Sequence, residues 1–276
     1  MNPKDLFHSE SIRKLELDLI ISELKTTDLL LEIGGGSGFQ AAIISGHVAK
    51  CVSIDVRQHP EVQYPIHLYD GTTIPFKDSS FDIIFSSSVL EHVRDLDGLL
   101  AECARVLKPN GIMYHIVPSP IWRIWTSLTY YLSLPKVLLA NFRNLALSDD
   151  SPPKWLGPNG KEQMAKGNNE QGAFIKPPPI VMIIRSFKLK WIRSILISPR
   201  HGERGNEITE AFYFRAHWWR RLFKKNGWRV ANEQPSQLFY SGNILFGTLV
   251  GLQTRRKLSH LLGSSTRLFK VVRLID

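Results

Sequence analysis

The sequence predicts an α/β fold: a doubly wound, seven-stranded, mostly parallel sheet with a long helical or loop insertion after the fifth strand. Short apolar runs, typical of buried parallel strands, alternate with segments that are apolar at helical spacing over residues 12–117. Helix-like and strand-like segments return after residue 210, beyond an insertion of about 95 residues. This alternation is typical of a sheet with helices on both faces.

Local patterns predict each element in order. Residues 12–24 are apolar at helical spacing and predict a leading helix, and the continuous apolar run at 29–33 stops at glycines, as a buried strand does. Lys108 to Gly111 ends a later helix, because its proline and glycine do not continue one. The other expected elements are helix 39–45, strands 48–55, 66–69 and 81–85, helix 96–107, strand 112–117, helix 214–226, and strands 228–233 and 244–252.

The composition predicts a folded cytoplasmic protein. Apolar residues make up 43% and charged residues 22% of the 276 residues. No uncharged apolar run reaches the roughly 18 residues of a spanning helix, and the first five residues are not followed by the apolar core of a secretory signal. Cys51 and Cys103 lack metal-type spacing, so we expect neither a disulfide framework nor a metal site.

The two halves of the chain differ in charge. Residues 1–117 hold 10 Lys/Arg against 16 Asp/Glu, a net of −6, whereas residues 118–276 hold 25 against 9, a net of +16. All seven tryptophans also fall in the second half. Such asymmetry suggests an acidic half that carries one kind of chemistry and a basic, aromatic half that meets a partner.

A glycine-rich segment, residues 32–38, lies between an expected strand and an expected helix, where backbone amides can meet a ligand. The dinucleotide fingerprint Gly-x-Gly-x-x-Gly does not fit. Counted forward from Gly34 its third glycine would be Phe39, and counted back from Gly38 its first would be Ile33. No Gly-Lys-Ser/Thr follows, which excludes a Walker-type loop. The spacing that fits is acid-x-Gly-x-Gly-x-Gly.

Six motifs follow one another between about residues 29 and 117. They are Glu32 to Gly38, Asp55 at the end of the second strand, Asp70-Gly71, Phe81-Asp82, Leu90-Glu91-His92-Val93 and Val106 to Gly111. In this order and spacing they resemble the class I S-adenosylmethionine-dependent methyltransferases, in particular the broad type 11 group. The resemblance implies a Rossmann-like methyltransferase fold, S-adenosylmethionine as cofactor and methyl transfer as activity.

The resemblance also implies a donor site. Its glycines would lie against the methionine part of the cofactor, Glu32 would help hold the amino group there, and Asp55 would accept from both ribose hydroxyls. Asp70 would accept from the adenine amine. Taken singly, an acid at a strand end is more often a helix cap or a solvated charge. The order and spacing of these acids and glycines, taken together, favour contact with a ligand. The expected cofactor-binding residues are Glu32, Gly34, Gly36, Gly38, Asp55, Asp70, Gly71 and Ser87.

A hydroxyl acceptor needs a general base, whereas an amine or thiol needs less help. The candidate bases are His92 and His115 in the first half and His201 and Glu203 in the segment 199–203. That His-Gly-Glu segment resembles a feature of type 11 members associated with saccharide pathways. We expect His201 to be the base, with Glu203 and His92 as further catalytic candidates. For His92, packing at the start of a helix is the interpretation we favour over catalysis, and for His201 and Glu203 a solvated loop remains an open alternative.

The basic half suggests the acceptor class. Residues 118–147 mix aromatic, leucine and basic side chains, which suits a helical lid or an interfacial helix, and residues 254–276 are basic and apolar at helical spacing. Two such segments favour contact with anionic lipid head groups, although a helix packed on the sheet would show the same pattern. We rank a saccharide or lipid-linked acceptor first, a small hydrophobic metabolite second and nucleic acid third.

Four segments are therefore expected: a cofactor-binding core at 1–117, an insertion and substrate lid at 118–210 that is mobile over 148–179, the completion of the sheet at 211–253, and a basic amphipathic tail at 254–276. The expected function is methyl transfer to a hydroxyl of a saccharide or lipid-linked acceptor, at the cytoplasmic face of a membrane. The alternative is a cofactor-binding scaffold that does not transfer the methyl group.

Overall fold

The computed structural model describes residues 3–147, 198, 200–206, 208–240 and 250–274. Their contacts define two units, one formed by Met1–Thr129 with Arg200–Asp276 and the other by Tyr130–Pro199. The first unit holds the sheet and the candidate site. The expected mobility of residues 148–179 lies outside the described residues.

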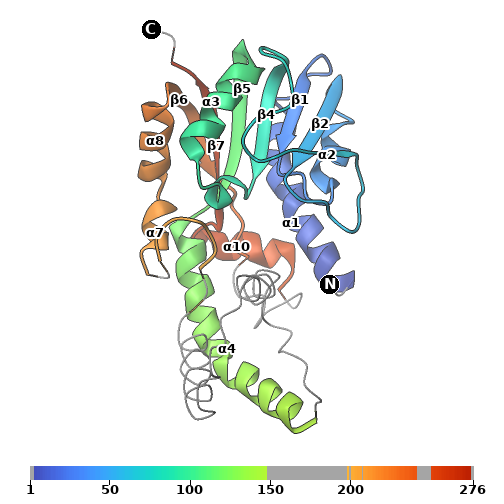
Figure 1. The fold of residues 1–276 in the computed structure, drawn as a ribbon. Helices are drawn as coiled ribbons and strands as arrows, with labels where there is room; N and C mark the ends of the chain where they lie inside the picture. The colour runs from blue at the N-terminus through green and yellow to red at the C-terminus, as the bar shows by residue number, and fades with distance from the viewer. Residues whose placement is uncertain (1–2, 148–197, 199, 207, 241–249, 275–276) are drawn as a thin grey trace, which may run out of the picture. The chain divides into compact units, whose positions relative to one another are not determined.

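A seven-stranded sheet forms the centre of the first unit, with the order β3-β2-β1-β4-β5-β7-β6. Strands β1 to β5 pair in parallel, and β7 pairs antiparallel with both β5 and β6. Figure 1 shows β2, β1, β4 and β5 side by side, with β7 beyond β5. The fold class predicted from the sequence is confirmed. The strands are β1 Leu29–Ile33, β2 Lys50–Asp55, β3 Ile66–Leu68, β4 Phe81–Ser87, β5 Leu107–Pro118, β6 Trp228–Pro235 and β7 Thr266–Arg273.

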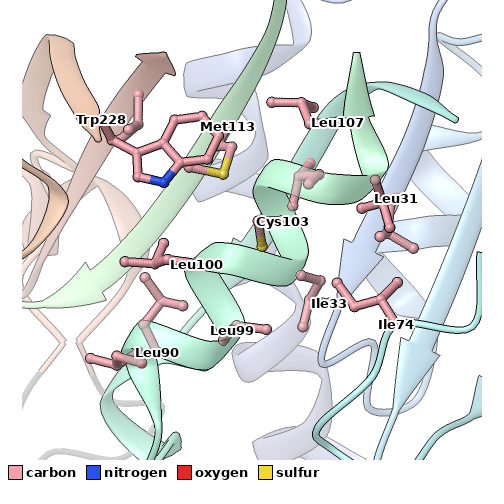
Figure 2. Packing of buried hydrophobic residues seen from close by; sticks show 14 of the residues in the cluster. Leu31, Ile33, Ile74, Leu90, Leu99, Leu100, Cys103, Leu107, Met113 and Trp228 are labelled. Atoms are coloured by element: carbon pink, nitrogen blue, oxygen red, sulfur yellow. The ribbon is translucent and has the colours of Figure 1, made fainter. Parts of the chain in front are cut away.

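Apolar side chains cover the sheet on both faces because those of successive strand residues point to opposite sides. On one face, Leu31 packs in a cluster with α3 and α8 residues such as Leu100 and Phe223; on the other, Leu30 packs with Leu17 of α1 and residues of α2. Figure 2 shows the first cluster, in which the leucines of α3 point to the strands. The helices of this unit are α1 Pro3–Ile21, α2 Phe39–Ile44, the short 3-10 helix η1 Leu90–His92, α3 Leu96–Val106, α7 Glu210–Tyr213, α8 Ala216–Lys225 and α10 Leu252–Leu262, and the long helix α4, Pro120–Leu147, begins in it.

The last part of the sheet differs from the prediction. The strand that completes it, β7, lies within the segment expected to be a helical tail. β7 pairs with a strand on each side, and its apolar residues pack in both core clusters, Leu268 in one and Phe269 and Val271 in the other, so they need no helical spacing. Gly263, whose φ is 88°, separates β7 from α10. Most of the strand expected at 244–252 lies outside the described residues, and Leu252 begins a helix instead.

Two further differences are local. The helix expected at 214–226 is confirmed as α8, but a separate short helix, α7, precedes it. Strand β5 begins at Leu107 and not at residue 112, directly where α3 ends. None of the helices in the described part of the chain combines the length and apolar character needed to cross a membrane.

Candidate active site at the carboxyl edge of the sheet

A cavity of about 460 Å³ opens where β1, β2 and β4 end. Parallel strands place their carboxyl ends at one edge, and the chain order reverses direction between β1 and β4, which is where such sheets bind ligands. The cavity is lined by Ile33, Gly34, Asp55, Val56, Tyr69, Gly71, Thr72, Ser88, Val89, His92, Val93, Arg94 and Asp95. Three predicted cofactor-binding residues (Gly34, Asp55 and Gly71) and one predicted catalytic residue (His92) therefore line it.

The glycine loop reaches the cavity at Gly34, whereas Gly36 and Gly38 are not among its lining residues. Gly34 has a φ of 77°, and a Cβ there would lie 2.3 Å from a methyl group of Val89, so a side chain is excluded by both conformation and space. Gly36 also has a positive φ, 56°, but a Cβ there would meet no atom within 4 Å. The space in front of Gly36 is therefore open to a ligand. Gly38 precedes α2 as its N-terminal cap residue.

The two acids nearest the loop have different surroundings. Asp55 ends β2 at the cavity, and its carboxylate accepts from the backbone N–H of Gly36 (2.8 Å) and of Arg57 (3.0 Å). Glu32 is buried beneath the loop, where its carboxylate accepts from the Ser53 hydroxyl at 2.5 Å. Burial raises the pKa of Glu32 to about 7, and the nearby Asp55 charge adds to this rise. Glu32 does not line the cavity itself.

Asp70 and Ser87 lie beside the cavity and not in its wall. The exposed Asp70 carboxylate accepts from the backbone N–H of Thr72 and Thr73, which lowers its pKa and fixes the turn that presents Gly71. The Ser87 hydroxyl accepts from the Arg13 guanidinium at 2.8 Å. It is the next residue, Ser88, that lines the cavity.

Ser88 carries backbone strain at this edge. Its φ is 55°, a region that residues other than glycine rarely adopt. Its backbone N–H donates to the Ile116 carbonyl (2.8 Å), and its hydroxyl accepts from Arg13 (3.0 Å). Strain of this kind costs about 1–3 kcal/mol and clusters at functional sites.

The second group of predicted residues meets around His92, and of its members only His92 lines the cavity. His92 ends η1 and lines the cavity, and the His201 ring lies 4.7 Å from the His92 ring and 4.6 Å from the Trp122 ring, centre to centre. The side chains of His92 and His201 are 45% and 37% exposed, so His92 is not packed in the core. Burial lowers the pKa of His92, while the neighbouring Glu91 carboxylate opposes that shift.

Hydrogen bonds from its backbone fix the loop that carries His201. A Glu210 carboxylate oxygen accepts from the backbone N–H of His201 (2.8 Å) and of Gly202 (2.5 Å), and Glu210 forms a buried ion pair with Arg123 at 2.9 Å. The Glu203 backbone N–H donates to the Glu91 carbonyl at 2.8 Å. The loop is therefore built into the fold at these residues.

The remaining candidate bases are engaged elsewhere. The Glu203 carboxylate forms an ion pair with Arg94 at 3.1 Å. His115 is fully buried in β5, where its Nδ1 hydrogen bonds with the Ser86 hydroxyl at 2.8 Å and its ring stacks on Phe223. Burial lowers the pKa of His115 to about 3, so this imidazole stays neutral at physiological pH.

Sequence reasoning missed two acids at this site, Glu91 and Glu210, as functional candidates. Glu91 stands inside one of the motifs, beside His92, and that position was a signal that could have been used. Glu210 gave no such signal, because its role depends on backbone N–H groups of a loop that only folding brings to it.

Comparison with known proteins identifies a methyltransferase domain. Residues 31–115 match the model of the type 11 methyltransferase domain family. The chain is 32% identical over 130 residues to the biotin biosynthesis bifunctional protein BioHC of Cellvibrio japonicus (strain Ueda107), covering 42% of this chain and 26% of that protein. It is 34% identical over 108 residues to the ubiquinone biosynthesis O-methyltransferase of Bradyrhizobium sp. (strain ORS 278), covering 36% and 42%. The chain thus spans less than half the length of these relatives.

Similarity of fold extends over nearly the whole chain. A chain in the solved complex between the Haloferax volcanii Trm112 methyltransferase activator and a methyltransferase superposes with a TM-score of 0.50 at 14% identity. The superposition covers 95% of this chain and 90% of that one, and at this identity it shows the fold alone. From the domain match, the motifs and the fold together, residues 31–115 of the chain form a type 11 methyltransferase domain of the class I S-adenosylmethionine-dependent kind.

Proposed function

We propose that this chain methylates a hydroxyl group of a saccharide or lipid-linked acceptor. The observation that carries the proposal is the meeting of two partly exposed imidazoles, His92 and His201, at the edge of a cavity whose other wall suits the methyl donor. A hydroxyl is the acceptor that needs such groups, because its oxygen must lose a proton as the new bond forms. The O-methyltransferase among the relatives points to the same acceptor atom.

The donor site fits the cofactor. The open space at Gly36 and the positive φ of Gly34 let a ligand lie against backbone, and Asp55 presents a carboxylate to the cavity for two ribose hydroxyls. Glu32, held beneath the loop, would place its carboxyl group close to the amino group, and the positive charge of that group would favour the ionised form. When bound, S-adenosylmethionine supplies a methyl group on a positively charged sulfur, which leaves readily in an in-line displacement.

The other assigned residues shape the ends of the site. Asp70 and Gly71 would border the adenine, through the carboxylate and the backbone, and the backbone at Ser87 would form the floor under the reacting centre. Gly38 would hold the start of α2 against the loop. These roles come from the motifs and are supported by the position of each residue at the carboxyl edge.

The chain's own residues handle the acceptor. His201 takes the proton from the acceptor hydroxyl as the methyl-to-oxygen bond forms and the methyl-to-sulfur bond breaks, leaving a methyl ether, the demethylated donor and an imidazolium. Glu203 orients Arg94 at the cavity wall by their ion pair. His92 forms the side of the acceptor space next to His201.

The test is methyl transfer from labelled S-adenosylmethionine into an extract of the source cells, separated into lipid, glycan, nucleic acid, protein and small-molecule fractions. We expect label in the glycan or lipid fraction, none with Asp55→Ala, a loss with His201→Ala, and full labelling with the exposed His47→Ala as a matched control. Label in the small-molecule fraction would favour the metabolite acceptor. Donor binding without label in any fraction would favour the scaffold function.

We also propose that the protein works in the cytoplasm at the surface of an anionic membrane. Helix α10 presents exposed Arg256, Lys257 and Leu261, and α4 presents exposed Ile124 and Leu128. Because β7 lies inside the sheet, only α10 and not the whole segment 254–276 is offered for this contact. We expect the protein to co-sediment with anionic vesicles and not with neutral ones. Replacing both Arg256 and Lys257 by glutamate should weaken this binding. Equal sedimentation with the two kinds of vesicle would contradict the proposal.

A further inference from the structure

The carboxylate of Glu91 is the most unusual group near the cavity. Its side chain is fully buried, and neither carboxylate oxygen has a hydrogen-bond partner among the described residues. A buried carboxylate without partners is costly, so such a group in a folded protein calls for a functional explanation.

Two imidazoles face this carboxylate. The Nε2 atoms of His201 and His92 lie 3.8 Å and 3.9 Å from the same Glu91 oxygen, Oε1. These distances are too long for hydrogen bonds but short enough for strong attraction once an imidazole is protonated. Because the two rings are only 4.7 Å apart, a second proton would be repelled, so the cluster suits a single shared positive charge.

The backbone enforces this meeting across more than a hundred residues of sequence. The Glu91 carbonyl accepts from the Glu203 N–H, and a Cβ at Gly202 would lie 2.8 Å from that carbonyl oxygen. Only a glycine lets the loop approach Glu91 this closely. His201 directly precedes Gly202, so this close approach brings its imidazole next to the Glu91 carboxylate.

Other charged groups lie around Glu91 and the two imidazoles. Arg13 of α1 and Tyr240 both interact electrostatically with Glu91, while Glu203 and Glu210 act on His92. Arg13 is already paired with Glu16 at 3.0 Å, and Glu210 with Arg123 at 2.9 Å. Arg204 lines a small pocket with Glu91 behind the cluster. The two imidazoles are the groups within 4 Å of the Glu91 carboxylate that can change charge near neutral pH.

We propose that Glu91 is the positioning residue for methyl transfer: its carboxylate orients His201 with Nε2–H toward Oε1, leaves Nδ1 free to take the acceptor's proton, and stabilises the resulting imidazolium. This inference rests on the proposed function. The proton leaves the acceptor oxygen as that oxygen gains the methyl group, resides on His201, and is lost to solvent after the products leave. No proton is transferred to Glu91 in this step, as none is to the carboxylate of a hydrolase triad.

The experiment compares Glu91→Gln, Glu91→Asp and the exposed control Glu61→Gln with the wild type. We expect Glu91→Gln to lower kcat about 100-fold or more, with KM and the donor Kd within about threefold. The acidic limb of its kcat profile should move to lower pH, because the imidazole loses the neighbouring negative charge. Glu91→Asp should restore part of kcat, and Glu61→Gln should behave as the wild type.

A second measurement does not depend on activity. Histidine-detected NMR titration of the apoprotein should show the His92 imidazole titrating at lower pH in Glu91→Gln than in the wild type, and unchanged in Glu61→Gln. The wild type could transfer no methyl group while the titration of His92 still shifts to lower pH in Glu91→Gln. In that case the proposed function fails, and the pairing of Glu91 with the imidazoles stands.

Three results would overturn the proposal. One is a kcat for Glu91→Gln equal to that of the wild type. Another is a loss of kcat matched by an equal loss of donor binding, with the pH profile unmoved, which would make Glu91 merely structural. The last is stoichiometric Zn²⁺ or Mn²⁺ binding that disappears in Glu91→Gln, together with loss of activity in EDTA, which would make the carboxylate and the two imidazoles metal ligands.

Discussion

The buried carboxylate of Glu32 should make the protein lose stability as pH rises through neutrality. Burial raises the pKa of Glu32 from its ordinary 4.5 to about 7 in the folded state. The folded protein therefore holds a proton that the unfolded chain releases between those two values. This contribution to stability is fully present below about pH 4.5 and is lost as pH rises through about 7.

The size of the effect follows from that rise in pKa. At 1.36 kcal/mol per pKa unit, the rise corresponds to about 3 kcal/mol of unfolding free energy. Glu32→Gln removes the ionisation and keeps an oxygen that accepts from Ser53. The difference in unfolding free energy between Glu32→Gln and wild type should thus grow by about 3 kcal/mol, in favour of the variant, from pH 4.5 to pH 8.

Urea unfolding at four or five pH values measures this difference directly. Any constant cost of the new amide cancels, because only the change with pH carries the argument. The exposed Glu61→Gln serves as the control for replacing a glutamate by a glutamine. A Glu32→Gln difference that stays constant to within about 0.5 kcal/mol across this range would refute the reasoning.

Three further predictions follow from the same geometry. Gly36→Ala should fold at a cost of about 1–2 kcal/mol for its positive φ, yet weaken donor binding at least tenfold in calorimetry, because the new methyl group fills the open ligand space; unchanged binding would place the donor elsewhere. Gly202→Ala pushes a Cβ against the Glu91 carbonyl and should cost about 1–3 kcal/mol in urea unfolding, with a lower kcat; full activity would show that the loop is not held there. His115→Leu should destabilise the protein by about 1–3 kcal/mol by leaving the Ser86 hydroxyl without its partner, while the pH profile of kcat stays in place; a moved profile would give His115 a part in the chemistry.

The sequence by itself determined the fold class, and it predicted residues, Gly34, Asp55 and Gly71 among them, that line the cavity at the carboxyl edge. Continuous apolar strands such as 29–33 and the glycine spacing that follows are local patterns, and each is set by residues adjacent in the chain. Asp55 could be predicted because a strand end fixes its place, and the carboxyl ends of parallel strands meet at one edge.

Only the tertiary structure decided which late segment completes the sheet and what surrounds the acceptor side. A fully buried strand and a helix face both show recurring apolar residues, so β7 could not be told from a helical tail until its pairing with β5 and β6 was known. His201 and Glu91 meet because Glu210 and the Glu91 carbonyl hold the loop, through backbone contacts at Gly202 that leave no pattern in side-chain spacing. Contacts between distant segments depend on packing, and that is the physical reason the sequence alone could not place them.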